Sequence, residues 1–586
     1  MDSIPWLNGN FHIPRALWLR HQFLELYPLD GGASFIIDEF VGTRDDREIT
    51  RKLITGELLI KWGPPGDLDW MRHGETRNLE LYCWLHRWYF IPSAARMYLV
   101  DRDETCAECV FDLIKSWTQQ IGLPRDAAEV IVREEKALAF DYQFQRGLLP
   151  SLEVHVPWEW HDFQPAYRLL ALLVATDLLR DSKALREHSD ELYAGIVAHA
   201  NSILWITKHY GYKHGNHHTL RMMVMYLAGA LVRNENAGQW LQTALEMQTR
   251  HMQEDFFADG MCKESLPGYA PFIITHFREV LLSAIVNKRE APEIFQATLR
   301  KSLALLQAMV MPDGYLPVIN DGPRVSIRGM EDLIGHYYPS AKSTSKTFLV
   351  NEACGFPIFH DKHNYLIFDA NDAHSTHVQA GKLGFILWRD AEPFIIEGGC
   401  CNYDNPDFQP YFRRGWAHST LLVDGEEDAI WKSFWVWEER AHPVITDHAE
   451  GDRPFVRAAS DGFKRLGVAW SRRIGQLDED RFVITDDIQN ATKTPRTFTF
   501  RFIVAQPDIA ADETKNQVII TGKKSTLKLQ ASVDSRIRIT RVKSNFFGDM
   551  REVPCIDFIV ASAKDVTQIF TIELNGSAHT QDRRTT

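Results

Sequence analysis

The chain has 586 residues, of which 45% are hydrophobic and 24% are charged, with a formal net charge of −13 at pH 7. This length exceeds that of one average domain, so two or three packed units with a large buried core are expected. The negative charge argues against nonspecific binding to nucleic acid or to an anionic membrane, because both partners require basic surfaces. An acidic substrate would need a local basic patch.

The eight cysteines lie mostly within apolar stretches and do not have the pattern of a disulfide framework. Cys106 and Cys109 have CxxC spacing inside a predicted helix, but the chain has no second CxxC pair, which argues against a zinc or redox site. The adjacent Cys400 and Cys401 are expected on opposite faces of a strand. The N-terminus lacks a basic and apolar leader pattern, and no uncharged apolar run of about 18 residues occurs. We expect a soluble protein, in the bacterial cytoplasm or, after loss of a signal peptide, the periplasm or exterior.

The chain is predicted to be mainly helical from about residue 78 to residue 320. Residues 1–75 contain Pro, Gly and short helical runs, and are interpreted as an irregular lead-in with a few helices packed on the next domain. From about Asn78 to Asn320, apolar residues recur at three- and four-residue spacing. The predicted helices are 79–98, 106–121, 166–179, 191–207, 219–232, 237–253, 272–286 and 292–309. Successive helices without intervening strands predict a bundle or a ring of helical hairpins.

After about Lys346 the apolar period changes from 3.6 to 2, which is typical of strands. The predicted strands are 365–368, 383–388, 393–396, 419–423, 482–484, 497–504, 517–520, 526–529, 537–541, 556–561 and 568–574. This pattern predicts an antiparallel domain of stacked sheets, and residues 340–345 have the composition of a linker. We therefore predict an α+β chain with a lead-in at 1–75, a helical domain at 76–345 and a β-sheet domain at 346–586.

An amide and an imidazole stand side by side just before a strongly apolar helical run, at Asn216 and His217. Such a pair can bind a sugar carboxylate and handle the acidic proton next to it. The alternative is ordinary helix capping, because an Asn side chain can accept a hydrogen bond from a free backbone N–H of the first turn.

Two further segments have side chains suited to an acidic sugar. Tyr269 ends a Pro-Gly turn at 263–269, where a phenol could transfer a proton to a leaving oxygen if cations lower its pKa, although a core role is the commoner one. Arg413 and Arg414 lie beside aromatic residues and could hold an acid by bidentate bonds and stacking. A solvated surface pair is the alternative for the two arginines.

A set of histidines and a carboxylate falls on neighbouring predicted strands or loops, at His374, His377, Glu397 and His418. Two imidazoles and a carboxylate are credible ligands for a divalent metal such as zinc. Solvated or core histidines are the alternative, because no HExxH or CxxC motif anchors the set.

Several short motifs follow one another in order along both halves of the chain. They lie at 216–217, 259–260, 264–269, 312–314, 320–321, 377–385, 397–399, Tyr403, 411–413 and 417–425. Their order and spacing, from about residue 80 to 575, resemble those of the heparinase II/III-like polysaccharide lyases. The resemblance implies an N-terminal (α/α) toroid of helical hairpins, C-terminal antiparallel β-sandwich-like sheets and an active site in the cleft between them. It also implies β-elimination of uronate-containing polysaccharides to 4,5-unsaturated uronate products.

The resemblance assigns roles to individual residues. Asn216 would bind the uronate carboxylate, and His217 would serve as the base for one uronate epimer. Tyr269 would act as the acid and, for the other epimer, also as the base. His374 would assist near the leaving group.

Four residues are expected to contact the substrate. Tyr403 and Arg413 match the family's motifs, and Arg414 and His214 would add to the local positive field that the acidic chain lacks overall.

The family's metal site would correspond to His377, Glu397 and His418, with three departures from the usual motif. Gln379 replaces an Asp, two residues rather than one separate the paired histidines, and Glu397 stands in place of an Asp. Glutamate keeps the oxygen ligand, so one structural divalent ion is predicted, with zinc first and manganese or calcium as alternatives.

The first functional hypothesis is a lyase that acts on glycosaminoglycans such as heparan sulfate, hyaluronan or chondroitin sulfate, and alginate is the second substrate. A toroid-type glycoside hydrolase would need two carboxylates about 5–9 Å apart. A noncatalytic carbohydrate-binding protein would need stacking aromatics but not Asn216, His217 or Tyr269. The expected partner is an anionic polysaccharide, without nucleic acid or membrane, and a homo-oligomer is left open.

Overall fold

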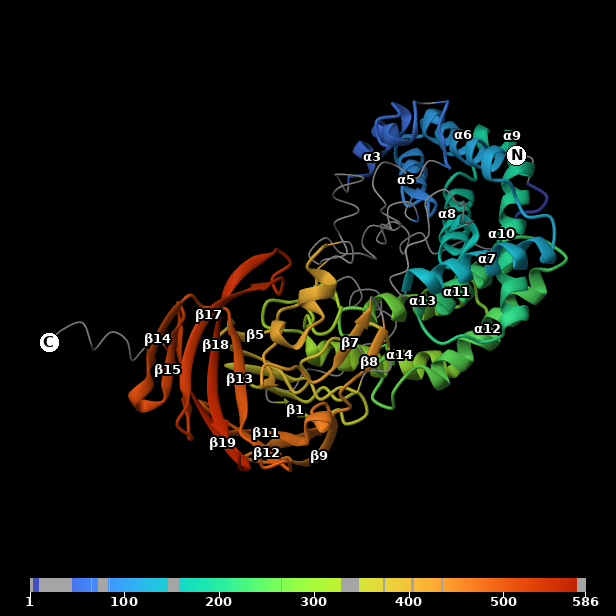
Figure 1. Ribbon diagram of the computed structural model, residues 1–586. Coiled ribbons are helices and arrows are strands. Elements are labelled where there is room, and N and C mark those ends of the chain that lie inside the picture. The colour runs from blue at the N-terminus through green and yellow to red at the C-terminus, as the bar shows by residue number, and fades with distance from the viewer. Residues whose placement is uncertain are drawn as a thin grey trace. The chain divides into compact units, whose positions relative to one another are not determined.

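The chain falls into two compact units (Figure 1). The computed structural model describes residues 4–9, 45–64, 66–71, 83, 85–145, 158–264, 266–327, 347–372, 375–401, 405–433 and 436–576. Unit 1 comprises Met1–Leu29, Ala33–Phe256 and Phe272–Arg300, and unit 2 comprises Asp30–Gly32, Phe257–Pro271 and Lys301–Thr586. This division does not follow the change from helices to strands, and the predicted boundaries at 75 and 345 lie outside the described residues. Those boundaries therefore stay predictions.

Unit 1 is helical in its described parts. Its helices are α3 (Asp46–Ile54), α5 (Ile91–Asp101), α6 (Glu104–Ile121), α7 (Ala127–Gln145), α8 (Gln164–Leu178), α9 (Lys183–Glu187), α10 (Ser189–Tyr210), α11 (Asn216–Leu231) and α12 (Ala237–Glu254), with α13 (Ala270–Val286) from Phe272 onward and α14 (Glu293–Met309) up to Arg300. α8 packs against α5, α10 and α11, and α11 packs against α12. Every residue of α8 is buried, as its nearly continuous apolar sequence requires.

Two helix predictions in unit 1 differ from the structure. The helix predicted over 79–98 is interrupted. Cys83 and Leu85 are helical, but residues 86–90 form turns and Trp88 has a φ of 57°, which the right-handed helix cannot accommodate, so α5 begins at Ile91. The apolar spacing there reflects burial instead, since the Trp88 ring packs edge-on against Trp117 at 5.2 Å. α7 was not predicted. Among its described side chains the buried stripe is narrow and consists of Val130, Glu134 and Ala137.

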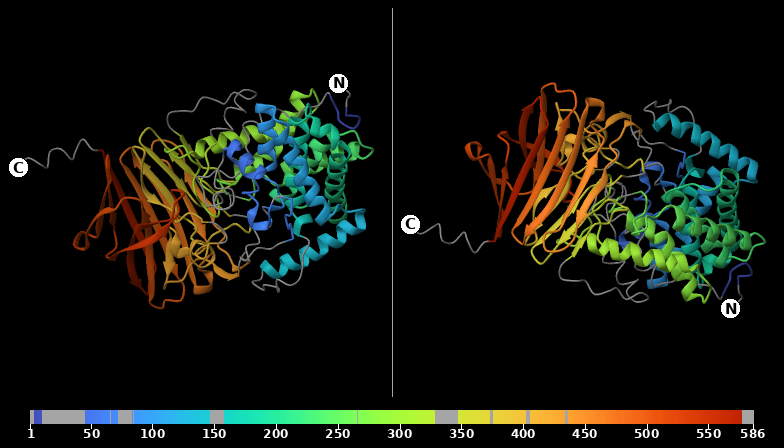
Figure 2. Two further views of the ribbon diagram at one scale, coloured as in Figure 1. Left: turned by 90° about the horizontal axis from the view of Figure 1, so that it is seen from above. Right: turned by 90° about the horizontal axis from the view of Figure 1, so that it is seen from below.

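Unit 2 contains two large antiparallel sheets and a short hairpin (Figures 1 and 2). The first sheet has the order β1-β2-β3-β4-β5-β13-β18-β17, with β6 paired to β13, and the second has the order β14-β15-β16-β19-β12-β11-β10-β9. The strands are β1 (Thr347–Leu349), β2 (Ile358–His360), β3 (Asn364–Phe368), β4 (Phe385–Arg389), β5 (Glu392–Ile396), β6 (Leu421–Val423), β7 (Ile430–Ser433), β8 (Val436–Glu439), β9 (Val444–Ala449), β10 (Phe455–Ser460), β11 (Val468–Asp478), β12 (Arg481–Asn490), β13 (Arg496–Val504), β14 (Asp508–Asp512), β15 (Gln517–Thr521), β16 (Ser525–Ala531), β17 (Arg536–Ser544), β18 (Arg551–Ser562) and β19 (Val566–Gly576). β7 pairs with β8 in the hairpin.

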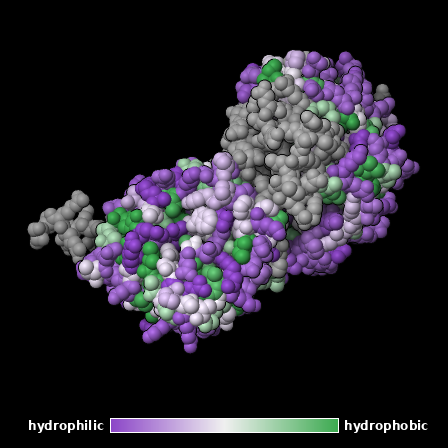
Figure 3. All heavy atoms as spheres, viewed as in Figure 1, coloured by the Kyte–Doolittle hydropathy of each residue, from purple (hydrophilic) through white to green (hydrophobic). Residues whose placement is uncertain are grey.

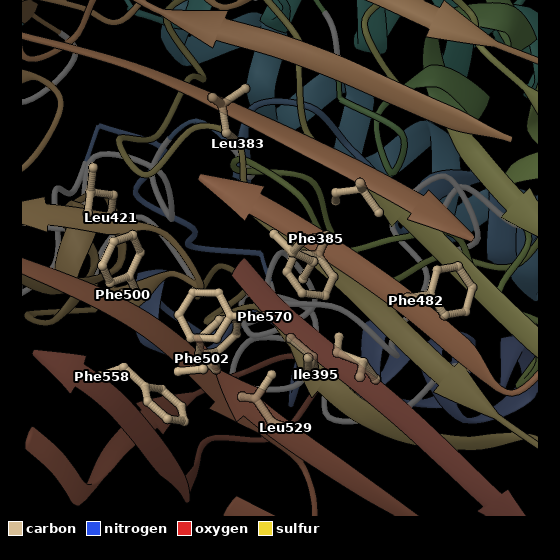
Figure 4. Close-up of a cluster of buried hydrophobic side chains, with 14 of the residues drawn as sticks. Leu383, Phe385, Ile395, Leu421, Phe482, Phe500, Phe502, Leu529, Phe558 and Phe570 are labelled. Atoms are coloured by element: carbon tan, nitrogen blue, oxygen red, sulfur yellow. The ribbon is translucent and has the colours of Figure 1, made fainter. Parts of the chain in front are cut away.

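The core of unit 2 lies between the inner faces of the two large sheets (Figure 4). Phe500 and Phe502 of β13 and Phe558 of β18, all in the first sheet, surround Phe570 of β19 in the second, with ring centroids 5.4, 5.0 and 5.2 Å away. Two sheets that share one apolar layer form a β-sandwich. Each predicted strand falls on an observed strand, but eight strands were missed: β1, β2, β7, β8, β9, β10, β11 and β14.

All eight cysteines lie at described positions, and no two of them form a disulfide. The placement of Cys400 and Cys401 on opposite faces of a strand is wrong. Neither lies in a strand, and both are buried in one small cluster with Phe408 and Phe412. Adjacent apolar side chains in irregular backbone need not alternate between faces, because the alternation requires extended pairing.

The surface visible in Figure 3 is predominantly hydrophilic, with hydrophobic residues scattered among polar ones. Scattered apolar residues are normal on a globular surface and do not mark a site by themselves. Within the described residues, no helix is both long and apolar enough to cross a bilayer.

Removal of the central ring of the sandwich should destabilise unit 2. We expect Phe570→Ala to lower the free energy of unfolding by about 3–5 kcal/mol, because a buried Phe truncated to Ala leaves a cavity as well as losing apolar burial. Urea unfolding followed by circular dichroism measures the loss. Ile569→Ala is the matched control, because this neighbour is 38% exposed. Equal losses in the two variants would contradict the assigned core.

Candidate active site

The loop before α11 is fixed by one carboxylate, that of Asp255. It accepts a hydrogen bond from the Gly215 N–H at 3.3 Å and pairs with Nδ1 of His214 and Nδ1 of His251. Although burial opposes ionisation, the bonds from His251 and His214 lower the pKa of the Asp255 carboxyl to about 2. Gly215 has a φ of 96°, which glycine adopts without strain. The loop therefore enters α11 in one defined conformation.

Asn216 and His217 form the first turn of α11, and Gly215 is its N-cap residue. The helix-capping alternative for Asn216 is wrong, because Asn216 lies inside the helix and no side chain caps this end. Asn216 is 3% exposed, and its backbone carbonyl accepts a hydrogen bond from Thr219 Oγ1 at 3.0 Å. Thr219 Oγ1 also lies 2.7 Å from Nδ1 of the buried His276 of α13.

His217 is held from two sides while its side chain stays 51% exposed. Its ring stacks on Phe163 with centroids 3.8 Å apart and an interplanar angle of 28°. Its Nδ1 is hydrogen-bonded to the carboxylate of Asp162, whose backbone carbonyl accepts a bond from Arg221 Nε at 3.0 Å. Asp162 lies 55 positions before His217 in the sequence, and no motif pointed to it.

The charge state of Asp162 determines the tautomer of His217. Burial opposes ionisation of this carboxyl, but His217, His161 and Arg221 lower its pKa far below the usual range. An ionised carboxylate can only accept hydrogen bonds, so Nδ1 of His217 carries the proton. Nε2 of the neutral ring is then unprotonated, and a half-exposed imidazole in this tautomer can act as a general base.

Tyr269 lies in unit 2, in the turn directly before α13. Its backbone N–H donates to the Leu266 carbonyl at 3.0 Å. Gly268 makes this turn possible, because a Cβ atom there would lie 2.1 Å from the carbonyl oxygen of Pro323. The Tyr269 ring packs against His377 with centroids 5.1 Å apart and an interplanar angle of 32°. A phenol and an imidazole are thus neighbours in this unit.

Asp321 links the segment that carries His377 to its surroundings. Its backbone N–H donates to the His377 carbonyl at 3.2 Å, and its carboxylate accepts from Gln379 Nε2 at 2.9 Å. His377 Nδ1 lies 3.7 Å from Asp321 Oδ2, and Arg413 Nη1 lies 3.6 Å from the same oxygen. Gln379, where the related motif has an Asp, therefore serves as a donor to a buried carboxylate.

The residues predicted to bind a metal do not meet as one ligand set in the described parts of the chain. His418 Nδ1 bonds to Glu397 Oε2 at 2.8 Å, and His418 Nε2 lies 2.9 Å from the Phe412 carbonyl, so both ring nitrogens are already engaged. His377 contacts Asp321 and Tyr269 instead. Among the residues with described positions, no three His, Cys, Asp or Glu side chains are placed to hold a metal ion. As described, His377, Glu397 and His418 do not form the predicted ligand set, and we assign the predicted metal ion no step.

The two arginines bond to protein groups. Arg413 is fully buried, and its Nη2 donates to the carbonyls of Thr376 at 2.8 Å and Val378 at 3.0 Å. Arg414 Nε donates to Glu427 Oε1 at 2.5 Å, and its guanidinium lies 4.3 Å from the Trp416 ring centroid.

The other predicted site residues are either exposed or outside the described residues. His214 is 71% exposed at its side chain while it contacts Asp255. His374 and Tyr403 lie outside the described residues, so their predicted roles are untested.

The comparisons with known proteins cover most of the chain. Residues 61–344 match the profile of the heparinase II/III N-terminus, and residues 344–573 match the heparinase II/III-like C-terminal profile. No curated protein sequence matches the chain.

Solved structures share this fold. The match to a crystal structure of heparinase III has 15% sequence identity and a TM-score of 0.73, and it covers 92% of this chain and 86% of the heparinase III chain. A heparan sulfate lyase HepC mutant from Pedobacter heparinus is 16% identical, with coverages of 90% and 83% and a TM-score of 0.66. Chondroitinase AC is 11% identical, with coverages of 94% and 82% and a TM-score of 0.51. The predicted fold, a helical toroid followed by antiparallel sheets, is confirmed.

Two buried histidines should make the stability of the helical unit depend on pH. Burial lowers the pKa of His218 and of His276 to about 3, against about 6.5 in the unfolded chain. Between these values the unfolded state binds more protons, so stability falls as the pH drops from about 6.5 towards 3. The expected slope is about 1.4 kcal/mol per pH unit for each histidine.

Urea unfolding followed by tryptophan fluorescence at a series of pH values measures this slope. His276→Gln should reduce it by the contribution of one proton. His209→Gln, at an exposed position on α10, is the control and should leave the slope unchanged. A wild-type free energy of unfolding that stays constant between pH 6.5 and 4 would contradict the claim that His218 and His276 remain neutral in the folded protein.

Proposed function

Because the chain belongs to the heparinase II/III-like family of polysaccharide lyases, we propose that it cleaves uronate-containing glycosaminoglycans by β-elimination. The observation that carries this proposal is the pairing of the half-exposed His217 with the ionised carboxylate of Asp162. That pairing holds a proton on Nδ1, so Nε2 is the nitrogen of the neutral ring that can accept a proton in the first step of the reaction. Heparan sulfate, hyaluronan and chondroitin sulfate are the proposed substrates, and alginate is the rival substrate.

The first step removes a weakly acidic proton. In the proposal, Nε2 of His217 takes the C5 proton of the uronate, and the C–H electron pair moves towards the C4–C5 bond. The resulting imidazolium is stabilised by the carboxylate of Asp162. Asn216 hydrogen-bonds the uronate carboxylate, which lowers the cost of the negative charge that develops next to it.

The second step breaks the C4–O4 bond. The C4–C5 double bond forms as O4 leaves, and we assign the proton that O4 receives to the Tyr269 hydroxyl. For a uronate of the opposite C5 configuration, Tyr269 would also remove the C5 proton. His377, packed against the Tyr269 ring, would restrict the orientation of the phenol.

The remaining candidates are given supporting roles. His214 is exposed beside Asp255 and would contact an acidic group of the polymer. Arg413 would act by bracing the backbone at Thr376 and Val378, and Arg414 by its bond to the Glu427 carboxylate. His374 beside the leaving group and Tyr403 on the substrate stay part of the proposal.

An assay on a panel of polysaccharides separates the candidate functions. The panel contains heparan sulfate, hyaluronan, chondroitin sulfate and alginate, and the ultraviolet absorbance of the unsaturated uronate is followed together with new reducing ends. Reducing ends without absorbance would indicate a hydrolase, and binding without either signal would indicate a noncatalytic protein.

Removal of the base or of the phenol should abolish most activity. We expect His217→Ala and Tyr269→Phe each to lower kcat about 10²–10⁴-fold, because each loses one proton-transfer group. Initial rates of absorbance increase measure the loss. His209→Ala, on the exposed end of α10, and Tyr193→Phe, whose hydroxyl accepts from Asn234, are the matched controls. Wild-type rates in both site variants would reject the assignment.

Asp162 is proposed as a positioning residue, because it acts through His217. Asp162→Asn should lower kcat about 10–10³-fold with little change in KM, since an amide can donate to Nδ1 and stabilise the wrong tautomer. Asp162→Glu should restore part of kcat, because it returns an ionised acceptor. Asp181→Asn is the control, because it removes the same negative charge from an exposed position in unit 1. A loss confined to KM, or no rescue by Glu, would argue against this role.

A further inference from the structure

The carboxylate that orients His217 lies in the connection that leads into α8. His161, Asp162 and Phe163 are the last three residues of this connection before the helix begins. Two of them contact the ring of His217, Asp162 through its carboxylate and Phe163 by stacking. The third, His161, has no role in the reaction proposed above.

The backbone of Asp162 has a conformation that needs support from its surroundings. Its φ of 57° lies in the left-handed region, which residues other than glycine seldom adopt. Such a conformation costs free energy and persists where neighbouring contacts fix it, often at functional sites. A change to an ordinary φ would redirect the carboxylate, so the contact with His217 depends on whatever holds this segment in place.

One support for Asp162 comes from the helix that carries the proposed base. Arg221 of α11 donates from Nε to the Asp162 carbonyl at 3.0 Å, and its Nη2 lies 3.5 Å from Asp162 Oδ1. Arg221 follows His217 by one helical turn, so both contacts tie Asp162 to the same helix. They do not attach the connection to any other element of unit 1.

His161 attaches the connection to a different helix, α7. Its Nδ1 lies 2.9 Å from Glu134 Oε2, and the two side chains are only 7% and 4% exposed. Its ring packs edge-on against Trp158 with centroids 5.1 Å apart, and its backbone N–H donates to the Trp158 carbonyl at 3.1 Å. The side chain and the backbone of His161 are therefore fixed together, directly before Asp162.

The charges of these side chains alternate from α7 towards α11. Burial opposes a charge on His161, but the hydrogen bond and the charge of Glu134 raise the pKa of the imidazole. Burial also opposes ionisation of Asp162, and the charge of His161 helps to lower the pKa of that carboxyl far below the usual range. A protonated His161 thus lies between two carboxylates and is attracted to both.

We propose that Glu134 is a positioning residue, whose ion pair with His161 holds the connection so that the Asp162 carboxylate meets Nδ1 of the base. The identity of the base comes from the proposed function, so this role rests on that function. The contacts from α7 through His161 and Asp162 to His217 rest on the structure alone. Glu134 contacts neither the substrate nor the base in this arrangement and acts only through His161.

The first test changes the acceptor on α7. Glu134→Met removes it at nearly constant size, and we expect kcat to fall about 10–10²-fold with little change in KM, as for a small misplacement of a catalytic group. Glu134→Gln should restore part of kcat, because its amide oxygen can accept the same hydrogen bond from His161. Glu135→Met is the matched control, because it removes the same charge from an exposed position on α7.

A double variant separates positioning from folding. Glu134→Met alone leaves His161 buried without its partner, which could unfold unit 1. Glu134→Met combined with His161→Phe replaces both partners by apolar groups, a change that is often neutral or stabilising for a buried pair. We expect the double variant to fold, as followed by urea unfolding, and to retain the loss of kcat.

The tautomer of His217 gives a readout that does not require lyase activity. Nuclear magnetic resonance of protein with isotope-labelled histidine distinguishes a protonated ring nitrogen from one with a lone pair, and His217→Gln assigns the signals. The wild-type ring should carry its proton on Nδ1, opposite Asp162. Glu134→Met and the double variant should each show a mixture of the two tautomers. Loss of stability alone would not change the tautomer of the folded protein.

Two results would overturn the positioning role: a folded double variant with wild-type kcat, or a folded double variant with the wild-type tautomer of His217. If the wild-type chain releases no unsaturated product while the tautomer changes in the variants, the positioning role stands and the proposed function fails. If the chain cleaves a polysaccharide and the double variant keeps both kcat and tautomer, the positioning role fails and the proposed function stands.

Discussion

Asp162 is partly buried and ionised where it contacts His217, and the chemistry assigned to the first turn of α11 depends on this contact. An isolated imidazole could carry its proton on either nitrogen. The carboxylate removes that freedom, because it accepts only from a protonated Nδ1. Phe163 restricts the ring further by stacking on it, and Arg221 holds the backbone carbonyl of Asp162. A second carboxylate, Asp255, orders the preceding loop and, through His251, the neighbouring His218. Two partly buried carboxylates thus set the proton positions on the adjacent His217 and His218.

Unit 2 positions its own polar groups by close backbone contacts and by the rigidity of its core. Gly268 lets the turn before Tyr269 approach Pro323, and Asp321 ties the His377 segment to Gln379. The sandwich core, centred on Phe570, includes residues of β3 and β4, the strands on either side of the segment that carries His377. Because such a core is close-packed, displacements of these two strands are resisted by many contacts.

The sequence was sufficient for the features that repeat along the chain. Apolar periodicity located most helices and strands, and the Asn216-His217 motif located one part of the candidate site. Contacts between residues distant in sequence were not predictable, since neither Asp162 nor Asp255 has a local signal that links it to His217 or His214. Trp88 was misassigned because an apolar residue in a buried turn has the same spacing as one in a helix. Arg413 was expected to contact a sugar because its type suits an acid, and only its burial shows that it holds the backbone.

The central claim is that the chain breaks uronate polymers by elimination at C4–C5 and not by addition of water. Mass spectrometry of the fragments released from a defined glycosaminoglycan oligosaccharide tests it most directly. Elimination predicts fragments whose masses sum to that of the starting oligosaccharide, with one fragment carrying the ultraviolet-absorbing unsaturated uronate. Fragments whose summed mass exceeds that of the starting oligosaccharide by one water for each cleaved bond, without ultraviolet absorbance, would contradict the claim.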